Sequence, residues 1–160
     1  MSIGYFLGGI AALIRHPASN KFLVLRRSQQ KDVGAGHWEC VTGRVDQGEG
    51  FQEALFREVK EEIGVDFQLE FLLGTTHFYR GKAIPENELI GVVYCGTIEN
   101  PDAIQVSHEH DEYRWLTPDE IREFFPETHW MIPYINRAEV LLKATPNSLH
   151  SLFTTEGFKF

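Results

Sequence analysis

The amino-acid sequence predicts an α+β fold in one domain that spans residues 1–160. Two observations carry this prediction. Short apolar runs bounded by Gly, Pro, Ser and Asn are typical of β-strands, whereas residues 51–63 place apolar side chains at helical spacing. The chain is also long enough to bury a core without disulfide or metal support, and its 42% hydrophobic and 24% charged residues are ordinary for a globular protein.

The first three predicted elements are strands. Residues 4–14 and 22–27 are apolar runs separated by a segment with turn chemistry, which indicates a pair of neighbouring strands. Residues 37–43 alternate in the manner of a half-buried strand. This strand ends at Gly43, and a glycine can adopt backbone angles that other residues avoid.

The next predicted element is a helix over residues 51–63. Its apolar side chains form one stripe: Leu55, Phe56, Val59 and Ile63. Such a stripe is expected to face the core of the domain. Gly64 follows directly and is the usual residue at the end of a helix.

The second half of the chain predicts a hairpin, a short strand and two helices. Residues 67–79 and 89–98 are apolar runs joined by a loop that contains Gly and Pro, which indicates a long hairpin. A further strand is predicted at 112–116. The segment 117–125 begins with Thr and Pro, and a Glu follows three residues after the Thr, which is the signature of a capping box. A last helix is predicted over 131–144.

Composition excludes several classes of protein. The net charge of −8 argues against a surface for nucleic acid or anionic membrane, because both need clustered Lys and Arg. Cys40 and Cys95 lie in separate apolar runs without the spacing of zinc sites or disulfide frameworks, so both are predicted to be buried thiols. The apolar stretch at 3–14 has no preceding basic residue and is too short to span a bilayer. A cytoplasmic protein is expected.

An acidic cluster on the predicted helix indicates a metal site. Glu58, Glu61 and Glu62 fall within about a 100° arc beside the apolar stripe, where like charges repel. Hard carboxylate oxygens at the edge of the core suit Mg²⁺ or Mn²⁺, and such a cation would turn the repulsion into binding energy. Taken alone, the cluster is equally well interpreted as a solvated surface face.

The context of this helix matches a known family. The segment from Gly43 to Val65 reads GRVDQGEGFQEALFREVKEEIGV. It contains a Gly, five residues, a Glu, seven residues, Arg-Glu, an aliphatic residue, any residue, Glu-Glu, any residue, Gly and an aliphatic residue. This closely resembles the Nudix box, with every fixed position filled. The resemblance implies a mixed β-sheet sandwiched between α-helices, and metal-dependent hydrolysis of a nucleoside diphosphate linked to another group.

The resemblance also implies a ligand set. By the family motif, the carboxylates of Glu58, Glu61 and Glu62 hold the metal, and Glu61 also belongs to the catalytic residues. Glu49 is expected near the metal, and the backbone carbonyl of Thr42 is a further candidate ligand. The physical chemistry agrees, because hydrolysis of a pyrophosphate needs a cation to offset the negative charge on the phosphoryl oxygens and a deprotonated water to attack phosphorus, and bound metal ions supply both.

Three arginines outside this ligand set have two interpretations each. Arg57 either tethers the neighbouring carboxylates, as in the family, or only relieves repulsion on the helix surface. We favour the tether, because an arginine can hold a carboxylate through two hydrogen bonds. Arg26 and Arg27 lie at the end of the second strand and either bind substrate phosphates or lie on the surface as ordinary charges.

The loop before the last strand supplies the candidate general base. Glu109 lies six residues before Trp115. This matches a loop glutamate in Nudix enzymes that cleave dinucleoside tetraphosphates, and in those that cleave dATP or dihydroneopterin triphosphate. Glu109 is therefore the candidate base or extra metal ligand, and the alternative is one charge among several in a solvated loop. His108 and His110 lack a third zinc ligand and are predicted to be loop histidines.

These observations predict a pyrophosphohydrolase with Mg²⁺ or Mn²⁺ that acts on a small nucleotide-like substrate, either a nucleoside-triphosphate-like compound or a dinucleoside polyphosphate. The alternative is a nucleotide-binding sensor on the Nudix fold, which would be expected to lose box carboxylates. Phe78, Tyr79 and Trp130 either stack on a base or belong to the core. The aromatic tail at 148–160 packs on its own domain or on a partner, which leaves a homodimer open.

Overall fold

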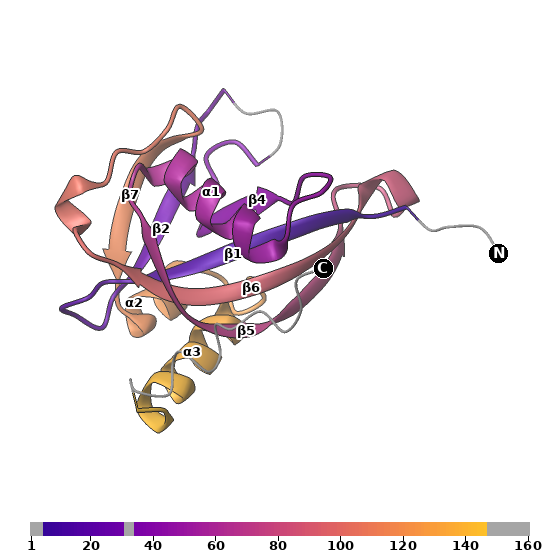
Figure 1. Cartoon of the computed structure of the whole chain (residues 1–160). Coiled ribbons are helices and arrows are strands. Elements are labelled where there is room, and N and C mark those ends of the chain that lie inside the picture. The colour runs from indigo at the N-terminus through magenta and orange to yellow at the C-terminus, as the bar shows by residue number, and fades with distance from the viewer. Residues whose placement is uncertain (1–4, 31–33, 147–160) are drawn as a thin grey trace.

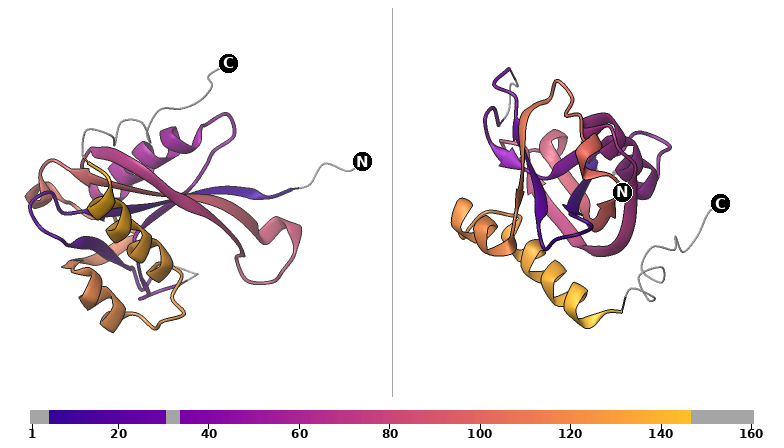
Figure 2. Two further views of the ribbon diagram at one scale, coloured as in Figure 1. Left: turned by 90° about the horizontal axis from the view of Figure 1, so that it is seen from below. Right: turned by 90° about the vertical axis from the view of Figure 1, so that its left-hand side faces the viewer.

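The computed structural model describes residues 5–30 and 34–146, and its chain folds as helices on both faces of a mixed β-sheet (Figures 1 and 2). The aromatic tail at 148–160 lies outside the described residues. The elements, in chain order, are β1 (Leu7–Arg15), β2 (Phe22–Arg27), β3 (Trp38–Glu39), β4 (Val41–Arg44), α1 (Phe51–Ile63), β5 (Phe67–Tyr79), η1 (Pro85–Asn87), β6 (Glu88–Ile98), η2 (Pro101–Ala103), β7 (His110–Leu116), α2 (Pro118–Phe124) and α3 (Ile132–Ala144).

The sheet runs in the order β3-β2-β1-β6-β5, and in addition β4 pairs with β1 and β7 pairs with β2. Strands β1 and β6 are parallel, and every other described pair is antiparallel. The predicted α+β class and the mixed sheet between helices are therefore confirmed. The β5–β6 hairpin is confirmed as well, and it extends beyond the rest of the sheet (Figure 1).

One prediction about the first strands needs correction. The predicted strand over 37–43 is two strands, because the chain leaves β2 after Glu39 and pairs with β1 from Val41 onward. The predicted pair of β1 and β2 is confirmed as antiparallel neighbours, with Arg15 facing Phe22 next to the turn. Strand β1 also pairs along its full length with β6, a strand that lies far away in sequence.

The core has one layer on each face of the sheet. Helix α1 buries Leu55, Val59 and Ile63 against one face, as the stripe predicted, and ends at Gly64 in the left-handed conformation with φ 76°. Phe56 does not belong to this buried stripe, since its side chain is exposed. Helices α2 and α3 cover the other face, and α2 begins with the predicted capping box at Thr117.

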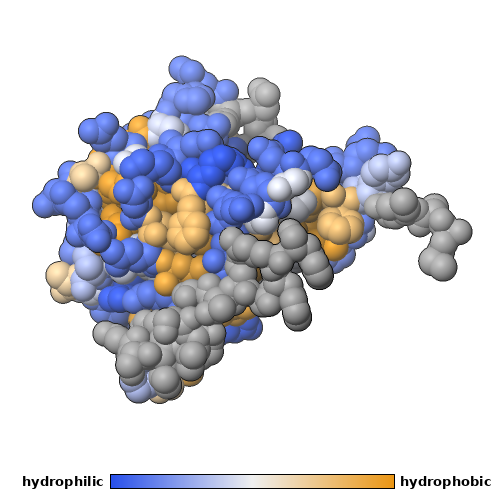
Figure 3. Space-filling view, viewed as in Figure 1, coloured by the Kyte–Doolittle hydropathy of each residue, from blue (hydrophilic) through white to orange (hydrophobic). Residues whose placement is uncertain are grey.

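Both cysteines are buried, as predicted. Within residues 5–30 and 34–146, no helix is long and apolar enough to cross a membrane. Hydrophilic side chains dominate the face that carries α1, with smaller apolar patches between them (Figure 3). The apolar stripe of α1 is packed against the sheet, whereas Glu61 on the same helix is open to solvent.

Candidate active site

Strand β4 and helix α1 pack closely against each other where the Glu58 side chain contacts Gly43. The Glu58 side chain lies against the backbone of Gly43, and a Cβ atom at that position would come well inside 3.0 Å of Glu58 Cγ and Cδ. Glu58 Oε1 accepts a hydrogen bond of 3.2 Å from the backbone N–H of Arg44. Only a glycine leaves room for this carboxylate, so Gly43 acts by its missing side chain rather than by shaping a turn.

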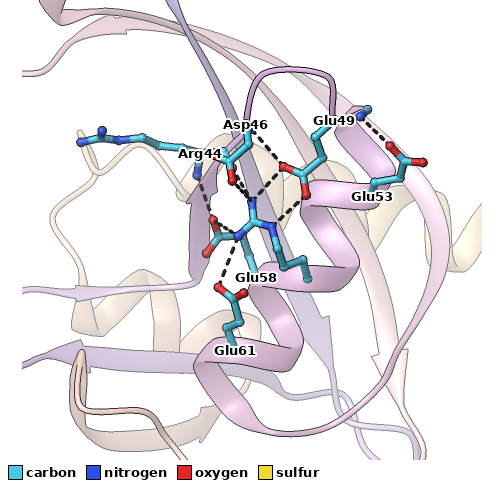
Figure 4. A network of polar contacts seen from close by, with 8 residues as sticks. Arg44, Asp46, Glu49, Glu53, Glu58 and Glu61 are labelled. Carbon is cyan, nitrogen blue, oxygen red and sulfur yellow. Dashed lines mark hydrogen bonds and ion pairs between the residues drawn. The ribbon is translucent and has the colours of Figure 1, made fainter.

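Arg57 holds the carboxylates of the box together (Figure 4). Its Nε and Nη2 donate to the two oxygens of Glu49 at 2.8 and 2.9 Å, which is a bidentate bond. Its Nη1 donates to Glu58 at 2.9 Å and to Glu61 at 3.3 Å. Nη2 also donates to the carbonyl oxygen of Arg44. These contacts match the tether interpretation of Arg57, and they show how one guanidinium offsets the repulsion among three carboxylates.

The loop before α1 brings Glu49 back to the helix. Besides its bond to Arg57, Glu49 Oε2 accepts a hydrogen bond of 2.9 Å from the backbone N–H of Asp46. The bond from Arg57, followed by that from Asp46, lowers the pKa of Glu49 to about 2. Glu49 is therefore a carboxylate at any ordinary pH, which is the form that binds a cation.

The three helix glutamates differ in their contact with solvent. The Glu61 side chain is 60% exposed and that of Glu58 is 15% exposed, while that of Glu62 is only 8% exposed. Burial raises the pKa of Glu58. Burial, together with repulsion from Glu39, Glu58 and Glu109, raises the pKa of Glu62 to about 9. The arc predicted from sequence thus runs from open solvent into the interior.

A buried acid–histidine cluster lies at the inner end of this arc. The His110 side chain is 1% exposed, with Nε2 3.6 Å from Glu39 Oε1 and Nδ1 4.0 Å from Glu62 Oε2. Among the described residues, neither ring nitrogen of His110 nor Glu62 Oε2 has a hydrogen-bond partner. The prediction that His110 is a loop histidine is wrong, because His110 begins β7 and points into the interior. His108 is exposed in a turn.

Glu109 lies beside the box helix. The backbone N–H of Ser107 donates to the carbonyl oxygen of Glu62 at 2.8 Å, which ties the loop to the last turn of α1. The carbonyl oxygen of Glu109 accepts a hydrogen bond of 2.8 Å from the backbone N–H of Ser28, and the backbone N–H of Glu109 donates a hydrogen bond to Ser107 Oγ. Its charge is close enough to raise the pKa of Glu62. The structure therefore brings Glu109 and the metal-ligand candidates together across 47 residues of sequence.

The two candidate phosphate-binding arginines of β2 differ from each other. Arg26 pairs with Asp111 at 2.6 Å and with Glu112 at 2.8 Å, both on β7. Arg27 pairs with Glu39 at 2.6 Å, and its charge lowers the pKa of Glu62. Arg27 thus lies at the buried cluster, whereas the ion pairs that Arg26 forms among the described residues are with β7 and not with the box or Glu109.

A cavity of about 520 Å³ opens beside the box. Phe78 and Trp130 form part of its wall, and both are partly exposed, so neither belongs to the core. Tyr79 is also exposed but does not line the cavity. The remaining lining residues are Gly9, Ile10, Ala11, Glu39, Thr42, Gly43, Thr76, His77 and Leu89. A lining that combines two aromatic side chains with Thr42, Gly43 and Glu39 suits a flat ring joined to a charged group.

The donor set fits a hard divalent cation. The oxygens of Glu49, Glu58, Glu61 and Glu62 are the ligands that Mg²⁺ prefers, and the buried Glu62 Oε2 has no described partner. Across the parts of the chain that the structure describes, no group of three or more His, Cys, Asp or Glu side chains forms a preassembled metal site. Instead Arg57 occupies the centre of the cluster and bonds three of the four carboxylates.

Sequence reasoning missed two residues of this site, Glu39 and His110. Glu39 was the single charged residue in an apolar strand pattern, a signal that a buried partner was needed. Its partners, Arg27 and His110, come from β2 and β7, so the pairing depends on the register of the sheet.

Comparison with known proteins agrees with this geometry. The family model described as NUDIX domain matches residues 7–138. The bis(5'-nucleosyl)-tetraphosphatase of Caenorhabditis elegans is 32% identical over 98 residues, which cover 59% of this chain and 66% of that relative. The CTP pyrophosphohydrolase of Escherichia coli (strain K12) is 28% identical over 138 residues, which cover 86% of this chain and 94% of that relative.

A solved structure shows the same fold. The MutT protein from Methanosarcina mazei Go1 superposes with a TM-score of 0.72 at 26% identity, over 89% of this chain and 99% of that one. The family match extends well beyond the box, from β1 into α3. The chain therefore belongs to the Nudix hydrolases, the family of enzymes that act on phosphoanhydride bonds.

Proposed function

We propose that this chain is a divalent-metal-dependent pyrophosphohydrolase whose substrate is a nucleoside-triphosphate-like compound or a dinucleoside polyphosphate. The observation that carries the proposal is the complete carboxylate set of the box, three of whose four members Arg57 holds, next to a cavity lined by two aromatic side chains. Two relatives act on such compounds by name, the worm tetraphosphatase and the bacterial CTP pyrophosphohydrolase.

In this proposal the carboxylates of Glu49, Glu58, Glu61 and Glu62 hold Mg²⁺ or Mn²⁺, with the backbone carbonyl of Thr42 as a further ligand. A bound divalent cation would offset the charge on the phosphoryl oxygens and lower the pKa of the attacking water. Arg57 keeps Glu49 and Glu58 in place. Its hydrogen bond lowers the pKa of Glu49, and at Glu58 it opposes the burial that raises the pKa of that group.

Glu109 is the proposed general base. Its loop is bound to the last turn of α1, so its carboxylate is near the ligand set without belonging to the helix. It accepts the proton of the attacking water while the water oxygen bonds to phosphorus and the P–O bond of the anhydride breaks. The electron pair leaves with the departing phosphate. A nucleoside triphosphate then yields a nucleoside monophosphate and pyrophosphate.

The cavity is the proposed place of the nucleobase. Phe78 and Trp130 offer aromatic faces for stacking, and Gly43, the first residue of the box, lines the same cavity. A base between the aromatic walls would direct the phosphate chain toward the carboxylates. The sensor hypothesis expects a depleted box, and every box carboxylate is present here.

The experiment is product analysis with dATP and with a dinucleoside tetraphosphate, in ¹⁸O-labelled water that contains Mg²⁺. We expect dAMP and pyrophosphate from dATP, with label in one of the two products. Glu61→Gln should lose nearly all activity. Glu53→Gln is the matched control, because Glu53 lies on the same helix and caps the N–H of Gly50, a bond that the glutamine oxygen also accepts.

Two outcomes would contradict the proposal. Release of orthophosphate with dADP would indicate a terminal phosphatase instead. Binding of both nucleotides without any product, in wild type and in Glu53→Gln alike, would indicate the sensor.

A further inference from the structure

Two arginines stand apart from the ion pairs of the chain. Among the described residues, the guanidinium groups of Arg44 and Arg80 form no hydrogen bond or ion pair, although acidic residues outnumber basic ones by 23 to 15. Figure 4 shows the Arg44 side chain extending away from the carboxylates of the box. The arginines that do bond a carboxylate or a carbonyl are Arg15, Arg26, Arg27, Arg57, Arg114, Arg122 and Arg137.

The register of the sheet places both arginines on the face that carries the cavity. Thr42 lines the cavity, and side chains alternate along a strand, so Arg44 shares its face. Phe78 also lines the cavity, and Arg80 follows it by two residues. The backbone N–H of Arg80 donates to the carbonyl oxygen of Asn87 at 2.9 Å, which continues the pairing of the hairpin past the end of β5.

The guanidinium groups of Arg44 and Arg80 are close enough for their charges to repel each other. Burial, and then repulsion from Arg44 and Arg27, lower the pKa of Arg80. Arg27 has Glu39 as a counter-ion, whereas Arg44 and Arg80 have none among the described residues. An anion bound between two such guanidinium groups would remove their repulsion, and phosphate oxygens match the fork of arginine hydrogen bonds.

Arg44 is also fixed relative to the metal-ligand candidates. Its backbone N–H donates to Glu58 Oε1 at 3.2 Å, and its carbonyl oxygen accepts from Arg57 at 2.9 Å. Its side chain therefore starts beside the box and extends toward the opposite face of β4. A phosphate that contacts Arg44 would belong to the same polyphosphate chain that reaches the carboxylates.

We propose that Arg44 and Arg80 together bind a phosphate group of the substrate that lies outside the ligand set of the box. This inference rests on the proposed function and narrows its substrate class. The group beyond the cleaved bond is itself phosphorylated, as in a nucleoside triphosphate or a dinucleoside tetraphosphate. A nucleotide sugar or ADP-ribose carries a neutral sugar there and gains nothing from two arginines.

The test uses inorganic tripolyphosphate as the probe, with binding measured by calorimetry in buffer that contains EDTA. Arg44→Gln and Arg80→Gln should each weaken binding by roughly 10-fold or more, because each removes charge-assisted hydrogen bonds to a phosphate. Lys82→Gln is the matched control. It removes the same charge two residues from Arg80, from an exposed side chain, and should change the affinity by less than roughly twofold.

Steady-state kinetics provide the second measurement. Both glutamine variants should raise KM for dATP more than they lower kcat, since a bond present throughout the reaction is lost. Arg44→Lys and Arg80→Lys keep the charge without the fork and should lie between wild type and the glutamine variants. Circular dichroism melts establish that each variant folds.

The inference is overturned if wild type does not bind tripolyphosphate, if both glutamine variants bind like wild type, or if Lys82→Gln is weakened equally. The outcome is separate from that of the proposed function, because this binding needs neither metal nor hydrolysis. If the chain hydrolyses no nucleotide but still binds tripolyphosphate through Arg44 and Arg80, the proposed enzymatic function is refuted and the proposed phosphate subsite is supported. If the chain is an active enzyme but its affinity for tripolyphosphate is unchanged in Arg44→Gln and Arg80→Gln, only the phosphate subsite is refuted.

Discussion

Replacing Gly43 with alanine should damage the site through a single contact, the one with Glu58. The backbone of Gly43 is not in the left-handed region, so alanine fits the strand conformation. The added methyl group would lie where Glu58 Cγ and Cδ now are, and a separation under 3.0 Å does not occur in real structures. Glu58 must therefore move away from β4.

The size of the effect follows from what Glu58 loses. It accepts hydrogen bonds from the backbone of Arg44 and from Arg57, and displacement weakens both. Overpacking of this kind costs about 1–3 kcal/mol, partly offset by the gain of about 0.4–1 kcal/mol that Gly→Ala brings by restricting the unfolded chain. We expect a net loss of about 1–2 kcal/mol in metal-free buffer, together with strongly reduced hydrolysis.

A double-mutant cycle tests this explanation. Urea unfolding of wild type, Gly43→Ala, Glu58→Ala and the double variant gives the four free energies of unfolding. If the clash is the cause, Gly43→Ala should become neutral or stabilising in the Glu58→Ala background, because the overlapping atoms are gone. Equal destabilisation by Gly43→Ala in both backgrounds would refute the reasoning and place the strain in the strand itself.

The remaining predictions concern two other acidic residues. Glu109→Gln should lower kcat by roughly 10²–10⁴ with little change in KM, as expected for the loss of a positioned base, and a rate within a few fold of wild type would remove Glu109 from the mechanism. Burial raises the pKa of Glu62 to about 9, against an unfolded value of 4.5. The folded chain then holds a proton that the unfolded chain has released, so metal-free stability should fall as pH rises from 4.5 to 9. Glu62→Gln should remove this slope and raise stability by up to about 3 kcal/mol at pH 7, measured by urea unfolding in EDTA. Parallel pH profiles of the two proteins would contradict this account.

What the sequence predicted well was encoded locally. The stripe of α1 and its terminal Gly64 fixed the helix to the residue, and the capping box at Thr117 placed α2. Each of these patterns involves residues no more than four positions apart, so it can be recognised in the sequence without knowledge of the fold. The box motif has the same character, because Arg57 reaches its three carboxylates within the span of one loop and one helix.

What the sequence did not reveal depends on distant pairings. The split of residues 37–43 into two strands follows from competition between β2 and β1 for the same segment. His110 was predicted to be a loop histidine because no third zinc ligand stands at a recognisable spacing, and its burial against Glu39 and Glu62 arises only when β7 pairs with β2. The gradient of exposure along the three helix glutamates likewise depends on which element covers the end of α1.

Strand β4 joins the two charged parts of this site through the alternation of its side chains. Gly43 lies against α1, where its missing side chain admits Glu58, and Arg44 points to the opposite face of β4, where its guanidinium has no counter-ion among the described residues. A shift of the register with β1 by one residue would exchange these faces. Arg44 would then meet the carboxylates of α1 and form an ion pair with them, and it would leave the opposite face of β4. The pairing of Gly9 with Arg44 therefore sets the strand geometry and also keeps the carboxylates proposed to bind the cation and the guanidinium proposed to bind phosphate on opposite sides of one short strand.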